Sequence, residues 1–222
     1  MKQLTKTENN PFSLSIGDLM AAVLFVVILL LAAAMLKLNE KQQKIDDVAE
    51  AYVNTNDSIV VALEQHFGDN LVDWGAELDP EKLSIRFTKK SMFDQDKSDI
   101  KPEFKNILNS FFPEYIKLLS KYRDNIVEIR IEGHTSSEGD YFHNMSLSQD
   151  RSRKVLDHCY KLVSPEDQEW MREKATANGL SYSHLIYEES GTEDVDRSRR
   201  VEFRVVTNSK EKLEEILRIN ND

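Results

Sequence analysis

The side chain with the clearest chemical potential is Asp18, because it lies inside a long apolar run. Residues 19–36 read LMAAVLFVVILLLAAAML without a charge, and extension back to residue 14 gives 23 residues interrupted only by this aspartate. About 20 apolar residues in a helix span the core of a bilayer. A membrane-embedded acid costs roughly 2.5–3.5 kcal/mol at mid-membrane, and such residues usually face a bundle interior and serve proton or ion transfer. The run therefore predicts an ion-carrying acid, the alternative being that Asp18 snorkels to the headgroups or caps the helix.

Small side chains share a helical face with this acid. At about 100° per residue, Ala22 and Ala32 lie within about 40° of Asp18, and Ala21 and Ala33 lie about 60° away. Small residues along one face allow helices to pack closely in a bilayer. We therefore predict a transmembrane helix over residues 13–38 that sits in a bundle with Asp18 facing protein. No Ser or Thr lies between residues 18 and 38, which favours protons over sodium as the carried ion.

The other groups of potentially reactive side chains do not indicate a metal site or a catalytic site. The spacings of His134, His143 and His158 with Cys159 match no common zinc arrangement. No Ser-His-Asp, paired-carboxylate or phosphate-loop signature stands out. We therefore expect no metal, no cofactor and no enzymatic activity.

Charge and composition narrow the class of protein further. The net charge of −10 leaves no basic excess for nucleic acid, so we expect no direct nucleic-acid binding. The single cysteine excludes an intrachain disulfide. The apolar run is too long for a signal-peptide core and is interpreted as an uncleaved anchor. Positively charged residues usually flank the cytoplasmic end of a span. Two lysines precede the apolar run, at 2 and 6, and three follow it, at 37, 41 and 44, so this rule does not by itself place the N-terminus in the cytoplasm.

Residues 39–76 follow the apolar run as a helical linker. Apolar residues recur there at three- and four-residue spacing, and NTND at 54–57 is suited to a turn or an N-cap. The apolar stripe fits equally a coiled-coil contact with a second copy and packing on the chain's own domain.

The remaining sequence alternates between strand and helix patterns. Strands are predicted at 83–87, 126–133, 180–188 and 199–206, and helices at 102–122, 144–163 and 209–222, with a short helix after 164. Pro102 suits a first helical turn, whereas Pro113 predicts a kink or break. This order implies helices packed on one face of a small mixed sheet.

Four linked motifs carry a resemblance to the peptidoglycan-binding domain of the OmpA/MotB family. They are MFDQDKSDIKPEF, IRIEGHTSSEG, NMSLSQDRSRKVL and DRSRRVEFRV, in the family's order and spacing over about 83–206. The N-terminal SIGDLMAAVLFVVILLL is similar to the single helix of stator B subunits. The resemblance implies one transmembrane helix plus an α+β, OmpA-like periplasmic domain with a mixed sheet and helices on one face.

The resemblance also implies a binding pocket for peptidoglycan. Arg151 falls on the family's carboxylate-binding arginine, and Asp94, Thr135 and Asn144 fall on pocket positions. Ser136 stands where the family has the aspartate of GHTD, which holds the ammonium group of diaminopimelate. Glu138 or Asp140 are candidates to replace that carboxylate. The alternative is that Arg151 braces the domain through an ion pair, as Arg199 and Arg200 would.

By resemblance, the chain is a B subunit of an ion-driven motor in the inner membrane. Two copies would lie inside a ring of five polytopic subunits of the MotA/ZorA type and would be tethered to peptidoglycan. The expected layout is a cytoplasmic tail (1–12), the transmembrane helix (13–38), the linker (39–76), the periplasmic OmpA-like domain (77–208) and a C-terminal helix or tail (209–222).

The kind of motor is indicated by departures from flagellar B subunits. The tail has ten residues before the proline at 11, the span has no Trp or Tyr, and GHTSS replaces GHTD. These features are more similar to Zorya antiphage defence motors than to flagellar stators. The alternatives are a flagellar-type stator subunit, another stator-like energiser of transport, and a passive OmpA-like wall tether without ion flux.

Overall fold

The computed structural model describes residues 11–88 and 92–209, and these form two units. The chain divides at residues 50 and 51, and the larger unit comprises Ala51–Glu214. Helix α1 (Pro11–Trp74) begins in the first unit and ends in the second. The expected C-terminal helix at 209–222 lies, beyond its first residue, outside the described residues.

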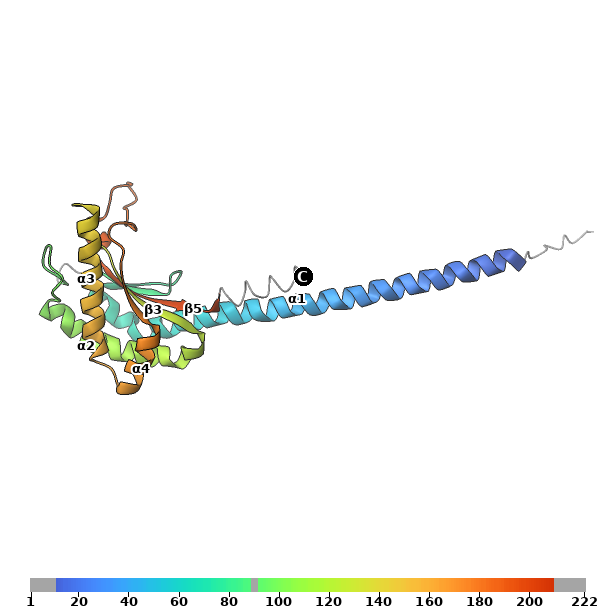
Figure 1. Ribbon diagram of the computed structural model, residues 1–222, viewed down its shortest axis with the longest axis horizontal. Helices are drawn as coiled ribbons and strands as arrows, with labels where there is room; N and C mark the ends of the chain where they lie inside the picture. Colours follow the sequence, from blue (N-terminus) through green and yellow to red (C-terminus); the bar gives the residue numbers. More distant parts are fainter. Residues whose placement is uncertain (1–10, 89–91, 210–222) are drawn as a thin grey trace, which may run out of the picture. The chain divides into compact units, whose positions relative to one another are not determined.

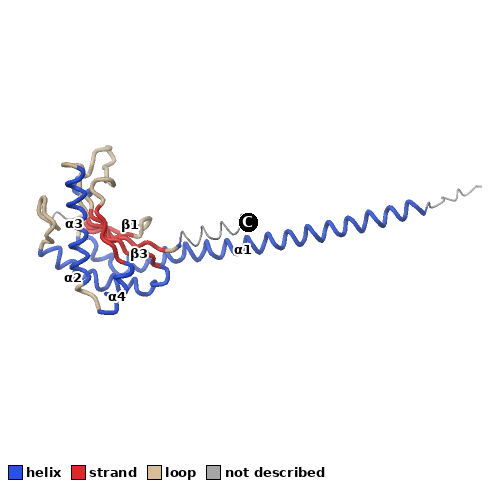
Figure 2. The backbone as a smooth tube through the Cα atoms, viewed as in Figure 1, coloured by secondary structure: helices blue, strands red, loops and turns tan. Residues whose placement is uncertain are grey.

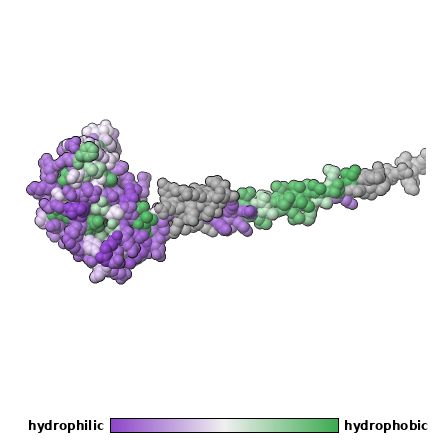
Figure 3. Space-filling model, in the orientation of Figure 1, coloured by the Kyte–Doolittle hydropathy of each residue, from purple (hydrophilic) through white to green (hydrophobic). Residues whose placement is uncertain are grey.

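Within the first unit, α1 carries a segment that qualifies as a membrane span. Ile16–Asp46 is the one stretch of the described residues long and apolar enough, and its most apolar 18-residue window has a mean hydropathy of 3.1. Its apolar side chains lie on the surface of the helix and form the green part of the helix in Figure 3, which is followed by a purple, polar end. The helix predicted at 13–38 is thus confirmed as a candidate span. It continues through 54–57 without the predicted interruption.

The second unit is built on a mixed five-stranded sheet, ordered β1-β2-β5-β3-β4 (Figures 1 and 2). Its strands are β1 (Ala76–Asp79), β2 (Ser84–Phe87), β3 (Ile126–Gly133), β4 (Ala175–Gly179) and β5 (Val201–Thr207). Strands β3 and β4 are parallel, and the other pairs are antiparallel. The strands predicted at 83–87, 126–133 and 199–206 are therefore confirmed within one or two residues.

Alternation along the strands gives the sheet one apolar and one charged face. In β5, Val201, Phe203 and Val205 are buried in the hydrophobic core, whereas Glu202 and Arg204 between them point to the opposite face. The register places Glu202 beside Arg86 of β2. Helices need to cover only the apolar face, as the alternating pattern predicted.

The covering helices begin where their sequences favour a start. Helix α2 (Pro102–Leu119) has its proline in the first turn, α3 (Tyr141–Tyr160) is capped by Asp140, and α4 (Pro165–Lys174) is capped by Ser164. The 3-10 helix η1 (Ser120–Asn125) follows α2, and the short α5 (Val195–Ser198) precedes β5. The predicted break at Pro113 is wrong. Proline donates no backbone hydrogen bond, but α2 continues past it to Leu119. The side chains on both sides of it, such as Phe112 and Tyr115, are buried in the core and stabilise this turn.

Aromatic side chains join helices and sheet in one core. Phe111 of α2 lies 5.1 Å from the ring centres of both Phe87 and Phe203, on β2 and β5. Phe67, near the end of α1, lies 5.2 Å from Phe111. The C-terminal part of α1 also buries Ile59 and Leu63 in this core. This part of the expected linker therefore packs on the chain's own domain, and the compact unit reaches back to Ala51.

Two glycines allow α3 to lie against the ends of β3 and β4. A Cβ atom at Gly133 would overlap the carbonyl oxygen of Ser148, and one at Gly179 would overlap the backbone of Gln149. The side chain of Gln149 accepts a 2.7 Å hydrogen bond from Gly179 N and donates a 3.0 Å bond to Ala177 O. These contacts fix α3 against the sheet at the edge where the pocket opens.

The strand predicted at 180–188 is wrong. The strand is β4, immediately before it, and residues 181–184 form a turn in which Ser181 has a φ of +50°. Ser181 N donates to Ser148 Oγ at 3.0 Å instead of to a neighbouring strand. Apolar alternation in LSYSHLIYE indicated a strand, whereas β4 (ATANG) owes its place to parallel pairing with β3 and to Gln149.

Candidate functional site

A cavity of about 650 Å³ opens at the carboxyl end of β3. Four segments line it: the loop after β2, the loop after β3, one face of α3, and the turn leading into β5. The five residues predicted as pocket residues all lie in this lining, namely Asp94, Thr135, Ser136, Asn144 and Arg151. The structure therefore brings together side chains up to 57 positions apart in the sequence.

Helix α3 supplies two of these side chains, Asn144 and Arg151. Asp140 accepts hydrogen bonds from Phe142 N and His143 N at 2.9 and 3.1 Å, which fixes the first turn. One turn on, the amide of Asn144 donates to Glu138 O at 2.8 Å and so ties the helix to the loop after β3. Arg151 lies seven residues further along the same face. Asp140 is occupied as an N-cap, so it does not replace the missing aspartate.

The guanidinium of Arg151 is held by backbone and by an aromatic ring. Its Nε donates to Lys97 O at 2.9 Å, its Nη2 donates to Asp94 O at 3.3 Å, and its carbon lies 4.8 Å from the ring centre of Phe93. Burial lowers the pKa of Arg151 to about 10, and the nearby charge of Arg199 acts in the same direction. The group remains charged at neutral pH. Among the described residues it forms no ion pair, so it holds the loop through backbone carbonyl groups and not through the ion pair of the alternative.

Asp94 lies at the rim of the cavity between two lysines. Its carboxylate lies 3.1 Å from Lys101 Nζ and 3.7 Å from Lys97 Nζ. The hydrogen bond from Lys101 is the main reason that its pKa is below the usual value. Its backbone carbonyl accepts from Lys97 N as well as from Arg151. Asp94 thus shapes the loop that positions the arginine.

The loop after β3 presents hydroxyl groups to the cavity. Thr135 is buried, its backbone N–H donates to Ser181 O at 2.9 Å, and its Oγ1 has no partner in the described part of the chain. Ser136 Oγ accepts a 3.0 Å hydrogen bond from Arg199 Nε. The same guanidinium pairs with Glu138. Position 136 therefore contributes a neutral acceptor where the family pattern has a negative charge.

A second polar anchor, Glu193, was missed by the sequence reasoning. Its carboxylate accepts from both the backbone N–H, at 3.1 Å, and the hydroxyl of Ser137. The sequence signal was weak, because Glu193 lies in the acidic stretch EESGTEDVD, which reads as a solvated loop. Arg199 was predicted only as a brace. It does pair with Glu138, but it also lines the cavity.

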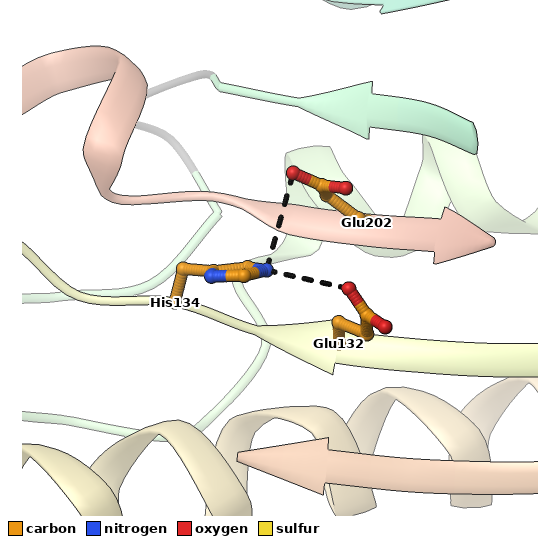
Figure 4. Close-up of side chains that lie close together, drawn as sticks. All are labelled: Glu132, His134 and Glu202. Atoms are coloured by element: carbon orange, nitrogen blue, oxygen red, sulfur yellow. Dashed lines mark ion pairs between the residues drawn. The ribbon is translucent and has the colours of Figure 1, made fainter. Parts of the chain in front are cut away.

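Beneath the cavity lies a buried cluster of Glu132, His134 and Glu202, whose ligand atoms lie within 4.8 Å of one another (Figure 4). His134 Nε2 is 3.7 Å from Glu132 and 3.9 Å from Glu202. Burial lowers the pKa of His134 and favours its neutral form.

The carboxylate of Glu202, however, already accepts hydrogen bonds from two arginines. Arg86 Nε donates to Glu202 Oε1 at 3.1 Å, and Arg200 Nε donates to the same oxygen. A metal ion here would face two guanidinium groups, so the arrangement favours an ion-pair network over a metal centre. Desolvation alone would raise the pKa of Glu202, but the arginines outweigh it and lower that pKa to about 2. Arg200 therefore pairs with Glu202 at the floor of the pocket, which is the bracing role that the alternative gave it.

Comparisons with known proteins agree with this fold. The OmpA family model matches residues 92–193, which include the whole lining except the start of the β2 loop and the turn before β5. Zorya protein ZorB from the Crooks strain of Escherichia coli is 40% identical over 97% of both chains. ZorB from Escherichia coli O139:H28 is 24% identical over 92% of this chain and 83% of its own. A MotB-like protein from Desulfovibrio vulgaris has the same fold, at 20% identity and a TM-score of 0.51, covering 71% of this chain and 94% of its own.

The candidate span, the mixed sheet and the OmpA family match define a protein with a candidate membrane span and an OmpA-family domain. Identity over almost the full length of both chains is decisive for the finer assignment. The chain belongs to the family of Zorya protein ZorB.

Proposed function

We propose that this chain is the wall-anchored B subunit of an ion-driven rotary motor in the bacterial inner membrane. The observation that carries the proposal is that one chain combines an acid-bearing candidate membrane span with a pocket around Arg151, which forms no ion pair among the described residues. Motors of this kind need both an ion carrier and a fixed point outside the membrane. The relationship to Zorya protein ZorB supports a role in antiphage defence.

The pocket is suited to hold the stem peptide of peptidoglycan. Arg151 has five N–H donors, of which two are used by backbone carbonyls. The remaining donors can form a two-pronged bond to a carboxylate, the geometry that guanidinium groups favour. Thr135 Oγ1 and the amide of Asn144 add polar contacts at the wall of the cavity. The role is binding and tethering, not catalysis.

Asp18 is proposed as the ion carrier, with protons favoured over sodium. The alanine stripe beside it fits close packing against partner helices, which would shield the acid from lipid. One charge crossing the membrane releases about 2.3 kcal/mol per 100 mV, which is ample to drive a conformational step. We propose that two copies of this chain lie within a ring of polytopic subunits of the MotA/ZorA type, five to two. The N-terminus would then be cytoplasmic and the OmpA-family domain periplasmic.

A passive wall tether is the second candidate, since a lone anchor also needs a span and a pocket. The two functions differ in what they require of Asp18. A motor loses protection against phage when Asp18 is changed to Asn, whereas a tether keeps it. Plating efficiency of phage on cells that produce the chain with its genomic neighbours distinguishes the two.

The wall-binding half is tested with the full chain in detergent and isolated sacculi. Wild type should co-sediment with sacculi, and Arg151→Ala should remain in the supernatant while still co-purifying with its polytopic partner. Co-sedimentation unchanged in Arg151→Ala would contradict the pocket's role. Failure to capture a polytopic partner would contradict the motor.

A further inference from the structure

The cavity's acids are already engaged within the protein. Asp94 lies 3.1 Å from Lys101 Nζ, and Asp96 lies 3.4 Å from His143 Nε2. Both acids therefore have a basic partner at the rim before any ligand arrives. An incoming ammonium group would have to compete with these partners.

The acids on the opposite wall are engaged as well. Glu138 pairs with Arg199, and Asp196 also takes part in an interaction within the chain. Ser136, between them, accepts a hydrogen bond from Arg199. The side of the cavity that would receive an ammonium group therefore presents a guanidinium and a neutral hydroxyl.

Among the described residues, the charged group of the lining that forms no ion pair is a cation, Arg151, although the charge of Asp96 attracts it at longer range. Among the described residues, Arg151 contacts only carbonyl oxygens and the face of Phe93, with no carboxylate in an ion pair with it. Thr135 Oγ1, in the same lining, is almost fully buried and lacks a hydrogen-bond partner in the part of the chain that the structure describes. A buried polar group without a partner carries a cost that a ligand removes. The guanidinium of Arg151 and the hydroxyl of Thr135 therefore favour an anionic ligand that also carries a hydrogen-bonding atom.

We propose that this pocket recognises the stem peptide through its carboxylate and does not require a free ammonium group beside it. The inference rests on the proposed wall-binding function and specifies its ligand. Formation of a cross-link acylates the distal amine of the stem and removes its positive charge, while the neighbouring carboxylate persists. The pocket consequently accepts cross-linked and uncross-linked stems alike, so anchorage does not depend on how mature the wall is.

The test compares three synthetic stem tetrapeptides that contain diaminopimelate, using calorimetry on the full chain in detergent. The first has a free distal amine, the second has that amine acetylated, and the third has the adjacent carboxylate amidated. We expect the first two to bind within about twofold of each other. The third should bind at least about tenfold more weakly, because it lacks the charge-assisted bonds to Arg151.

A designed change at position 136 provides the complementary result. Ser136→Asp should create a preference of about fivefold or more for the free-amine peptide, because it adds a carboxylate to the cavity. Ser136→Asn has the same shape without the charge and should create none. Thermal unfolding of both variants confirms that they remain folded.

The outcomes separate this inference from the function on which it rests. A wild-type preference of about tenfold for the free amine, or equal binding of the amidated peptide, overturns the inference while leaving wall binding intact. Absence of binding to all three peptides overturns the pocket's wall-binding role together with the inference.

Discussion

Arg151 is the residue on which wall binding should depend most strongly. Arg151→Lys keeps the positive charge but loses the planar fork, the two carbonyl bonds and the stacking on Phe93. We expect co-sedimentation with sacculi to weaken by about tenfold or more, which corresponds to at least about 1.4 kcal/mol. Binding isotherms with purified sacculi measure this change.

The matched control lies two residues further along α3. Arg153 is exposed, and its described ion pair is with Asp150 at 3.6 Å. Arg153→Lys should leave both wall binding and stability within about 0.5 kcal/mol of wild type. An equal loss of binding in both variants would show that guanidinium groups of α3 act without regard to position, which contradicts a specific role for the pocket around Arg151.

Glu202 should govern how stability depends on pH. Its pKa is about 2 in the folded state, below its ordinary value near 4.5, because Arg86 and Arg200 favour the charged form. A carboxyl group whose pKa is lower in the folded than in the unfolded state stabilises the fold at pH values above its unfolded-state pKa. This stabilisation is lost as the pH falls from about 5 towards 2. The contribution is on the order of 3 kcal/mol. Urea unfolding of the wild type from pH 7 to pH 3 should show the decline.

Glu202→Gln removes the charge but keeps the shape of the side chain. It leaves the buried guanidinium of Arg200 without its carboxylate, whereas Arg86 keeps its pair with Asp79, and should cost about 3–5 kcal/mol at pH 7. Its stability should then fall less steeply between pH 5 and 3 than that of the wild type. Glu166→Gln, at an 82% exposed side chain, should change neither property. Parallel pH profiles for wild type and Glu202→Gln would contradict the assignment.

At the scale of elements, the contact between α3 and the sheet should couple stability to binding. Gly179→Ala places a methyl group into the backbone of Gln149 and should cost about 1–3 kcal/mol. Because α3 carries Arg151, wall binding should weaken as well. Gly68→Ala is the control, since the nearest atom lies 4.0 Å away in helix α1. It should stabilise the fold by about 0.5–1 kcal/mol, as thermal unfolding will show.

The last turns of α1 should be indispensable to the domain. A chain that begins at residue 77 lacks Ile59, Leu63 and Phe67, each of which contributes about 1.5–3 kcal/mol on burial. We expect it not to fold, whereas a chain that begins at residue 51 should fold cooperatively. Circular dichroism during urea unfolding distinguishes them. A cooperative transition in the shorter chain would show that the domain begins where the strand pattern begins.

The sequence predicted the elements with strong local patterns and missed those that depend on distant partners. The alternating runs at 126–133 and 199–206 and the proline-started α2 could be recognised from neighbouring residues alone. Strand β4 (ATANG) has no such pattern, because it forms through pairing with β3 and hydrogen bonds from Gln149. Motif resemblance placed all five pocket residues in one cavity. It could not foresee that Arg199 and Glu138 would pair across it.

At the scale of the whole molecule, the topology of the chain can be tested by cysteine labelling. The natural Cys159 is fully buried, so a native background of labelling should be low. Val72→Cys, at an 83% exposed position, should react in intact cells with a maleimide that enters only the periplasm, whereas Lys2→Cys should not. Reaction of Lys2→Cys alone would place the OmpA-family domain in the cytoplasm and contradict the proposed orientation.

Ion transfer through Asp18 is the central claim, and flux across a membrane tests it most directly. The chain is purified with its polytopic partner, reconstituted into liposomes and subjected to a potassium diffusion potential while internal pH is recorded. Wild type should take up protons, and Asp18→Asn should abolish uptake although the complex remains intact. Absence of flux in the wild type, or equal flux in Asp18→Asn, would contradict the motor and leave a passive wall tether.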